Sequence, residues 1–400
     1  MGADGPSEPA FGFGRGALPT YDASGLAGVL PAVARSLGVE EPVDHRGDRS
    51  APRNLLDLAP ARRAVVVLID GLGYELLRQR SGHAPFLRGL MPAAHRLCAG
   101  FPSTTATSMG TFGTGLPPGA HGLVGCEVLV PGEDRLVNEL SWENGPDPRL
   151  WQPCQTVFER AAADGLSVTR IGPGFFDGSG LTNAALRGGT FTAAHLLDDR
   201  VDSALAAVRA SKRALVYLYW GELDKVGHVH GCQSWEWGDE LERIDGAIAR
   251  LVAGVPSDTS VHITADHGMV DAPHELRIDL AHDVELAGGI RHVGGEPRSL
   301  QLYCEQGAAD DVLATWRERV DVRAWVLSRG EAIGHGLFGA VSEPVLPRIG
   351  DIVVAMRDNF AIVDSRTARP KLLALLGLHG SLTPEEMTVP LLQVLARDSI

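Results

Sequence analysis

The chain has 400 residues, of which 36 are basic and 50 acidic, and its formal net charge is −14. An acidic surface repels the backbone of DNA and RNA, so we expect no stable nucleic-acid partner; bound metals could still attract a small phosphorylated substrate. The 44% hydrophobic content is enough for one large α/β domain or two smaller ones.

The cysteines and the apolar runs bear on the compartment. The five cysteines are widely spaced and form no CxxC pair, which disfavours both a disulfide framework and a cysteine-ligated zinc site. The N-terminal residues lack a basic start followed by an apolar run, and no stretch is long enough to span a bilayer. We therefore expect a cytoplasmic protein with no membrane partner; the oligomeric state stays open.

The apolar pattern along the chain predicts an α/β fold. Residues 1–20 are rich in Gly and Pro, and we expect them to be loose, whereas residues 21–39 carry a helical pattern. The run at 64–69 is rich in β-branched residues and typical of a strand buried on both faces. Similar runs recur further on, with helical patterns between them, at 167–171, 214–219, 260–264 and 351–355. This alternation predicts a mostly parallel central sheet sandwiched by helices.

A separate α/β insertion is predicted at residues 285–345. It reads as a strand, a helix and a strand, at 299–304, 310–320 and 324–328. We expect the chain to rejoin the central sheet at Asp351, so that 21–284 and 346–400 form the core. Long insertions near the ends of a sheet often cover a substrate, which makes this one a candidate lid.

Asp70-Gly71 closes the strand at 64–69. Ligands of open α/β sheets bind at the carboxyl ends of the strands, where residues distant in sequence can meet. The carboxylate of Asp70 would lie there, and Gly71 allows a sharp turn. A helix-capping or turn Asp is the alternative.

Small and hydroxylated residues fill the segment from Phe101 to Gly122. We expect a loop that enters a helix near Thr105, where free backbone N–H groups and the helix dipole suit a phosphate. A hydroxyl in that place can act as a nucleophile when it also binds a metal. The alternative is a closely packed helix that needs small residues.

Three further places carry metal-ligand residue types. Asp224 and His228 are four apart, so one helical turn would put them on the same face, as a zinc site or as a solvent-facing pair. Asp266 and His267 follow the strand at 260–264, and Gly268 permits the backbone bend that lets both reach one metal. His379 precedes Gly380; alone, it could equally be a histidine satisfied by core hydrogen bonds.

Together these motifs resemble the nucleotide pyrophosphatase/phosphodiesterase branch of the alkaline phosphatase superfamily. The order is that of the family: DG, FPSTT…TGLPPGAHG, D-x-x-x-H, ADHGM and HGS, spread from Ala64 to Leu392. The resemblance implies a metal held by Asp70, Asp266, His267 and the Thr105 oxygen. It implies a second metal held by Asp224, His228 and His379.

The resemblance also implies a mechanism and a metal. Thr105, rather than Ser103 or Thr104, falls on the family's nucleophile position, and the reaction would pass through a phospho-threonine intermediate. Ligand sets made only of Asp and His fit zinc best, with manganese or iron as alternatives.

The sequence departs from the family at positions that bind the substrate in classical members. Cys126 stands where classical members carry a phosphate-binding asparagine, and a thiol is a poor substitute donor. Tyr219 is near the position of a nucleobase-clamping aromatic residue but could equally belong to the core. Arg298, in the insertion, could reach the site, although a surface or structural role is the simpler interpretation.

These observations predict a two-metal hydrolase of phosphate esters, a phosphodiesterase or nucleotide pyrophosphatase acting on a small phosphorylated substrate. A phosphomonoesterase or phosphonate hydrolase with the same metals is the alternative. A sulfatase is disfavoured because the chain has no Cys-x-Pro-x-Arg stretch. A metal-binding protein without turnover is the alternative of another class, which a nucleophilic hydroxyl and a second metal site both disfavour.

Overall fold

The computed structural model describes residues 13–14, 16–22, 24–40 and 56–397. Most of the segment expected to be loose, 1–12 and residue 15, lies outside this description, and the described part of 1–20 contains neither helix nor strand. The helix expected at 21–39 is present as α1 (Val29–Ser36), after a 3-10 turn at Leu26–Gly28.

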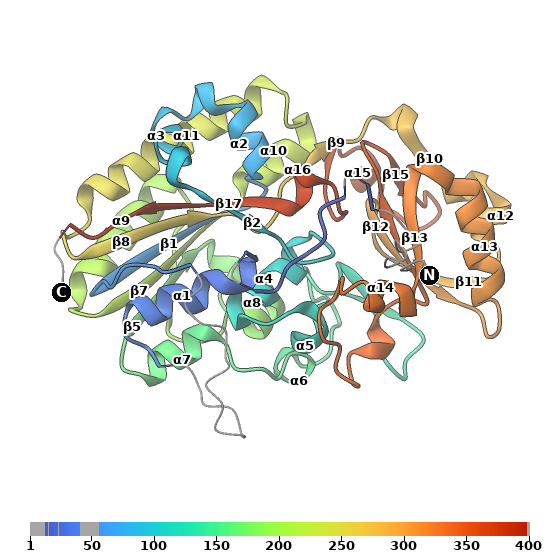
Figure 1. Ribbon diagram of the computed structural model, residues 1–400, viewed down its shortest axis with the longest axis horizontal. Helices are drawn as coiled ribbons and strands as arrows, with labels where there is room; N and C mark the ends of the chain where they lie inside the picture. Colours follow the sequence, from blue (N-terminus) through green and yellow to red (C-terminus); the bar gives the residue numbers. More distant parts are fainter. Residues whose placement is uncertain (1–12, 15, 23, 41–55, 398–400) are drawn as a thin grey trace, which may run out of the picture.

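Seven strands form the central sheet (Figure 1). The five strands β8, β1, β7, β5 and β6 are parallel; β17 runs antiparallel between β8 and β2. The predicted mostly parallel sheet is therefore confirmed. In spatial order the strands are β2 (His95–Cys98), β17 (Thr388–Val394), β8 (Thr259–Thr264), β1 (Arg63–Ile69), β7 (Ala214–Trp220), β5 (Ser167–Gly172) and β6 (Thr190–Ala193).

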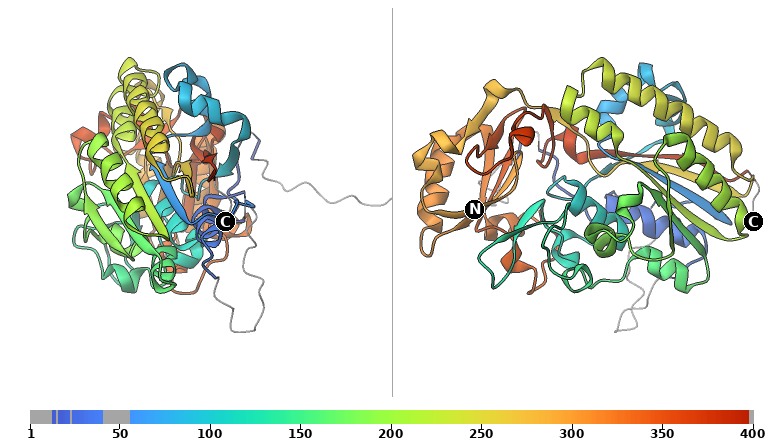
Figure 2. Two further views of the ribbon diagram at one scale, coloured as in Figure 1. Left: turned by 90° about the vertical axis from the view of Figure 1, so that its left-hand side faces the viewer. Right: turned by 180° about the vertical axis from the view of Figure 1, so that it is seen from behind.

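Helices cover both faces of this sheet (Figures 1 and 2). One layer contains α2 (Tyr74–Gln79), α3 (Pro85–Leu90), α9 (Leu197–Ala210), α10 (Glu222–His230) and α11 (Trp235–Gly254). The other contains α1, α4 (Thr105–Thr114), α5 (Pro118–His121), α7 (Val157–Ala163) and α8 (Gly180–Ala185).

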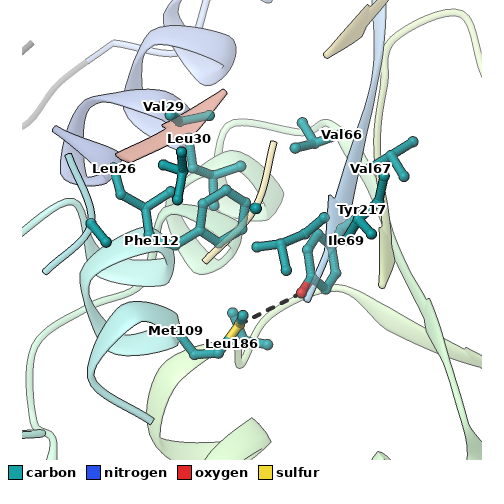
Figure 3. Close-up of a cluster of buried hydrophobic side chains, with 14 of the residues drawn as sticks. Leu26, Val29, Leu30, Val66, Val67, Ile69, Met109, Phe112, Leu186 and Tyr217 are labelled. Carbon is teal, nitrogen blue, oxygen red and sulfur yellow. Dashed lines mark hydrogen bonds between the residues drawn. The ribbon is translucent and has the colours of Figure 1, made fainter. Parts of the chain in front are cut away.

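The central strand β1 is buried over six of its seven residues, from Ala64 to Ile69. Its two faces are covered by different helix layers, which is why the run has no polar alternation. Figure 3 shows one of these faces, where Val66 and the neighbouring Tyr217 of β7 lie towards Phe112 of α4. This packing holds α4, which carries Thr105, against the sheet.

A second sheet of four strands lies at one end of the molecule (Figure 1), with its own hydrophobic core. All its neighbouring strands are antiparallel, and α13 packs against it. The strand–helix–strand pattern predicted from 299 to 328 is present. In order the strands are β11 (Ile290–Glu296), β12 (Ser299–Cys304), β14 (Ile352–Met356) and β13 (Ala324–Ser328), with α13 at Ala309–Val320.

The expectation that the chain rejoins the central sheet at Asp351 is wrong. Residues 352–356 form β14, which lies between β12 and β13 of the small sheet. Its apolar run suits any strand buried on both faces, so the sequence alone could not choose the sheet. The chain returns to the central sheet only at β17, whose first residue is Thr388.

Short elements complete the described chain. They are α6 (Pro148–Trp151), α12 (Val284–Ala287), α14 (Arg329–Gly334), α15 (Pro370–Leu373), α16 (Pro384–Met387), β3 (Glu127–Leu129), β4 (Leu136–Asn138), β9 (Val270–Asp271), β10 (Arg277–Asp279), β15 (Ala361–Val363) and β16 (Gly377–Leu378). Within the described residues, no helix combines the length and the apolar character needed to cross a bilayer.

Candidate metal centre and active site

The carboxyl ends of three adjacent parallel strands bring the predicted acidic residues together. Asp70 directly follows β1, Asp266 comes two residues after β8, and Asp224 lies in the first turn of α10, just after β7. Because β1 pairs with both β7 and β8, all three carboxylates reach the same edge of the sheet.

Asp70, Asp266 and His267 form the first candidate metal site, with ligand atoms within 4.8 Å of one another. His267 Nε2 lies 3.4 Å from Asp70 Oδ1 and 3.4 Å from Asp266 Oδ2. All three side chains are buried. This is one of the two ligand groups expected from the sequence.

Asp224, His228 and His379 form the second group, again within 4.8 Å. His228 Nε2 is 3.3 Å from Asp224 Oδ2, and His379 Nε2 is 3.8 Å from Asp224 Oδ1. The rings of His267 and His379 stack at 3.8 Å between centroids, so the two groups are direct neighbours.

The three candidate histidine ligands all bond to the backbone through the same ring nitrogen, Nδ1. The Nδ1 atoms of His228, His267 and His379 contact the backbone carbonyls of Gly377, Gly268 and Ser103, at 2.6, 3.0 and 3.1 Å. A carbonyl only accepts hydrogen bonds, so each Nδ1 must carry the hydrogen. In the neutral imidazole, Nε2 then keeps the lone pair that a metal ligand needs.

Each of the three ligand carboxylates has one oxygen that receives no hydrogen bond. Asp70 Oδ1, Asp224 Oδ1 and Asp266 Oδ2 are buried without a hydrogen-bond partner. Burial, followed by repulsion from Asp266 and Asp224, raises the pKa of Asp70 well above its usual value. Unpartnered anionic oxygens beside imidazole lone pairs fit divalent cations, and these donor types suit zinc.

Thr105 is the first residue of α4, and its side chain is partly exposed. Its Oγ1 lies 3.2 Å from His267 Nε2, beside the first group. The neighbouring hydroxyls are used elsewhere: Ser103 Oγ donates to the Ser381 carbonyl at 2.7 Å, and Thr104 bonds to Glu296. The arrangement therefore favours Thr105 over both as the reactive hydroxyl.

The three residues considered for the substrate, Tyr219, Arg298 and Cys126, lie in different surroundings. The Tyr219 hydroxyl donates to Asp70 Oδ2, so this side chain does lie at the site, as a partner of a candidate ligand. Arg298 does not reach it: the guanidinium is fully buried and paired with Glu386 at 2.7 Å. Cys126 Sγ accepts from Asn138 Nδ2 at 3.6 Å, and burial raises the pKa of the Cys126 thiol.

Sequence reasoning missed Glu296. Its carboxyl group lies 3.6 Å from His379 Nδ1, and burial raises its pKa to about 8. The residue comes from β11 of the small sheet, and only the preceding glycine pair marks it in the sequence. A lone Glu next to two glycines is too common a pattern to identify.

Comparison with known proteins identifies the family of this chain. The family model for type I phosphodiesterase/nucleotide pyrophosphatase matches residues 64–382. An uncharacterized pyrophosphatase/phosphodiesterase of Schizosaccharomyces pombe is 28% identical over 202 residues, which are 48% of this chain and 39% of that protein. The match thus spans about two fifths of that relative's length.

Solved structures share the fold. Murine ectonucleotide pyrophosphatase/phosphodiesterase 5, in an inactive form with AMP, matches with a TM-score of 0.67 and 18% identity, over 82% of this chain and 87% of that one. Phosphonoacetate hydrolase from Sinorhizobium meliloti, with phosphonoformate, matches with a TM-score of 0.65 and 20% identity, over 83% and 90%. With the family model covering most of its length, this chain belongs to the type I phosphodiesterase/nucleotide pyrophosphatase family.

Proposed function

We propose that this protein hydrolyses phosphate esters, with Thr105 as the nucleophile and two divalent cations as cofactors. The observation that carries the proposal is the placement of the Thr105 hydroxyl beside two adjacent three-ligand groups. A structural metal site needs neither a second ligand group nor a partly exposed hydroxyl next to it.

The two ligand groups would each hold one cation. Asp70, Asp266 and His267 would hold one cation, and a second set would hold the other: Asp224, His228 and His379. When bound, the cations would favour the deprotonated hydroxyl and offset the charge gained by the phosphoryl group in the transition state. We take zinc as the metal, because all the protein ligands are Asp and His.

Thr105 would form a bond from Oγ1 to phosphorus while the bond from phosphorus to the departing oxygen breaks. Its place at the N-terminus of α4 points the first backbone N–H groups and the helix dipole at the phosphoryl oxygens. Water would then attack the phospho-threonine from the opposite side, releasing phosphate or its monoester and restoring the hydroxyl.

The substrate class follows from the family and the structural neighbours. We favour a phosphodiester or nucleotide pyrophosphate, because the family model carries that description and a neighbour was solved with AMP. A phosphonate or phosphomonoester is the second candidate, since a phosphonoacetate hydrolase shares the fold to almost the same degree.

The first prediction tests the nucleophile. Thr105→Ala should lower kcat for bis-p-nitrophenyl phosphate by at least about a thousandfold, because no other hydroxyl takes its place. The variant should still bind close to two metal ions per chain, measured by metal analysis. Thr107→Val is the matched control, because Thr107 is buried on the same helix and its hydroxyl has no partner.

The outcomes separate the alternatives. Full activity of Thr105→Ala would move the nucleophile elsewhere. Faster turnover of p-nitrophenyl phosphate than of the diester by the wild type would favour the monoesterase. Turnover of neither substrate, with two ions bound, would favour a metal-binding protein without catalysis.

A further inference from the structure

Glu296 lies outside both ligand groups but touches their surroundings. It ends β11, and its Oε2 lies 3.6 Å from His379 Nδ1. The Thr104 hydroxyl forms a hydrogen bond with the same carboxyl group, and Oε1 is buried with no partner. One side chain of the small sheet thus contacts a candidate ligand and the residue before the candidate nucleophile.

The backbone around Glu296 is shaped for this approach. Gly295 has φ +81°, and a Cβ there would lie 2.1 Å from the Ser299 carbonyl oxygen. A Cβ on Gly294 would lie 2.5 Å from the Glu127 carbonyl oxygen. Only glycine fits both positions, so the pair fixes the course of the hairpin that carries Glu296. The room beside His379 comes from Gly380, where a Cβ would lie 2.9 Å from Glu296 Oε1.

The other side of the hairpin turn is held to the core. Arg298 Nε and Nη2 donate to Glu386 Oε1 and Oε2 at 2.8 and 2.7 Å. Glu386 also accepts from the Ser381 amide at 3.0 Å, two residues after His379. The segment that carries Glu296 and the segment that carries His379 are therefore joined by a buried, fully hydrogen-bonded contact.

The contacts of His379 explain what Glu296 can do. Nδ1–H donates to the Ser103 carbonyl, and the carboxyl group of Glu296 lies against the same edge of the ring. Groups that contact the non-ligating nitrogen fix the ring orientation of a metal-binding histidine. Here the Ser103 carbonyl takes the hydrogen bond, and the Glu296 carboxyl group packs beside it at 3.6 Å. Through Thr104, the same group also restrains the entry of the chain into α4.

We propose that Glu296 is a positioning residue that orients His379 and the N-terminus of α4, and so couples the small sheet to the second metal group. The proposal rests on the proposed function, because it assumes that Asp224, His228 and His379 hold a cation. It makes Glu296 neither a ligand nor a catalytic group.

The test is a Zn²⁺ titration of the metal-free full-length protein against a chromophoric chelator, which yields an affinity for each of two sites. Glu296→Ala should weaken one site about 10- to 100-fold, the usual effect of losing an outer partner, and leave the other within about threefold. Glu296→Asp should also weaken it, because the shorter side chain withdraws the carboxyl group. Glu296→Gln should lose least, since its amide oxygen still accepts from Thr104.

Two comparisons identify the weakened site and exclude a general effect. Asp224→Asn should weaken the same site, and Glu296→Ala should add little in that background, because the site is already impaired. Glu318→Gln, on the exposed face of α13 in the same part of the chain, is the control and should match the wild type. Unfolding of each metal-free variant by denaturant should leave the midpoint nearly unchanged.

Each failure has its own meaning. Wild-type affinities at both sites in Glu296→Ala and Glu296→Asp would overturn the positioning role and leave the proposed function intact. Equal weakening of both sites would also overturn it. A wild-type protein that binds fewer than two ions would instead contradict the proposed function. If the alanine variant does not fold, the aspartate variant decides.

Discussion

At the scale of single residues, the fold controls which ring nitrogen of each histidine is free. Three candidate ligands donate Nδ1–H to backbone carbonyls, so in the neutral ring Nε2 is the nitrogen open to a metal. His121 has the opposite tautomer: Nδ1 accepts from the Leu123 amide, so Nε2–H donates to the Thr111 hydroxyl at 3.1 Å. That histidine is structural, and its neutral form is the one the fold requires.

The tautomer of His121 predicts acid sensitivity. Burial, with a smaller effect of Arg348, lowers the pKa of His121 to about 3, whereas an unfolded histidine titrates near 6.5. The folded pKa is depressed, so the stabilisation is complete above pH 6.5 and is lost as the pH falls towards 3. Between about pH 7.5 and pH 5 this one group should remove about 2 kcal/mol from the free energy of unfolding.

Denaturant unfolding of the metal-free protein at both pH values measures this loss. His121→Asn should be less stable at the higher pH but should lose about 2 kcal/mol less on acidification. The exposed His282, replaced by Asn, is the control and should change neither value. An identical loss in wild type and His121→Asn would contradict the assignment.

At the scale of elements, α4 has both features that the sequence left as alternatives: a helix start suited to a phosphate, and close packing through small residues. Its N-terminus carries Thr105, and its small residues allow close packing. A Cβ on Gly113 would lie 1.9 Å from the Ala185 carbonyl oxygen of α8, and one on Gly110 would lie 2.5 Å from the His121 ring. The close packing fixes the direction of the helix that presents the hydroxyl.

We therefore expect Gly113→Ala to displace α4 and to lower both stability, by roughly 1–3 kcal/mol, and kcat. Gly89→Ala in α3 is the matched control, because nothing lies within 4 Å of the added methyl group. In that helix interior alanine should be neutral or stabilising, by up to about 1 kcal/mol. Thermal unfolding and diesterase assays of both variants test the contrast; equal behaviour would contradict it.

At the scale of the whole molecule, a buried ion pair joins the small sheet to the core. Arg298 and Glu386 are both fully buried, and the pair bridges the turn after β11 and helix α16. Arg298 thus serves the connection between the two sheets, not substrate binding as the sequence allowed. A charge taken out of water is tolerated only while its counter-charge is present.

Removing one partner should be costly. Arg298→Met should lower the free energy of unfolding by about 3–5 kcal/mol, because it leaves the Glu386 carboxylate buried without a counter-charge. Adding Glu386→Gln should recover part of that loss, which a double-mutant cycle in denaturant would measure. A fully additive pair of effects would show that the two side chains do not interact.

Local pattern alone determined much of this protein. The apolar runs at β1, β7 and β8 predicted the parallel sheet, because a strand buried on both faces is apolar over consecutive residues. The order of DG, FPSTT, D-x-x-x-H, ADHGM and HGS predicted which side chains would meet. Those motifs follow strands or enter helices, and parallel strands end at one edge.

Only the tertiary structure decided the rest. The apolar run of β14 is as suitable for one sheet as for the other, so its partner strands had to be chosen by long-range packing. His228 and His379 donate Nδ1–H to carbonyls that are 149 and 276 residues away in the chain. The roles of Glu296 and Arg298 were decided in the same way. Each is a charged side chain buried by folding, and its partners lie far away in the sequence.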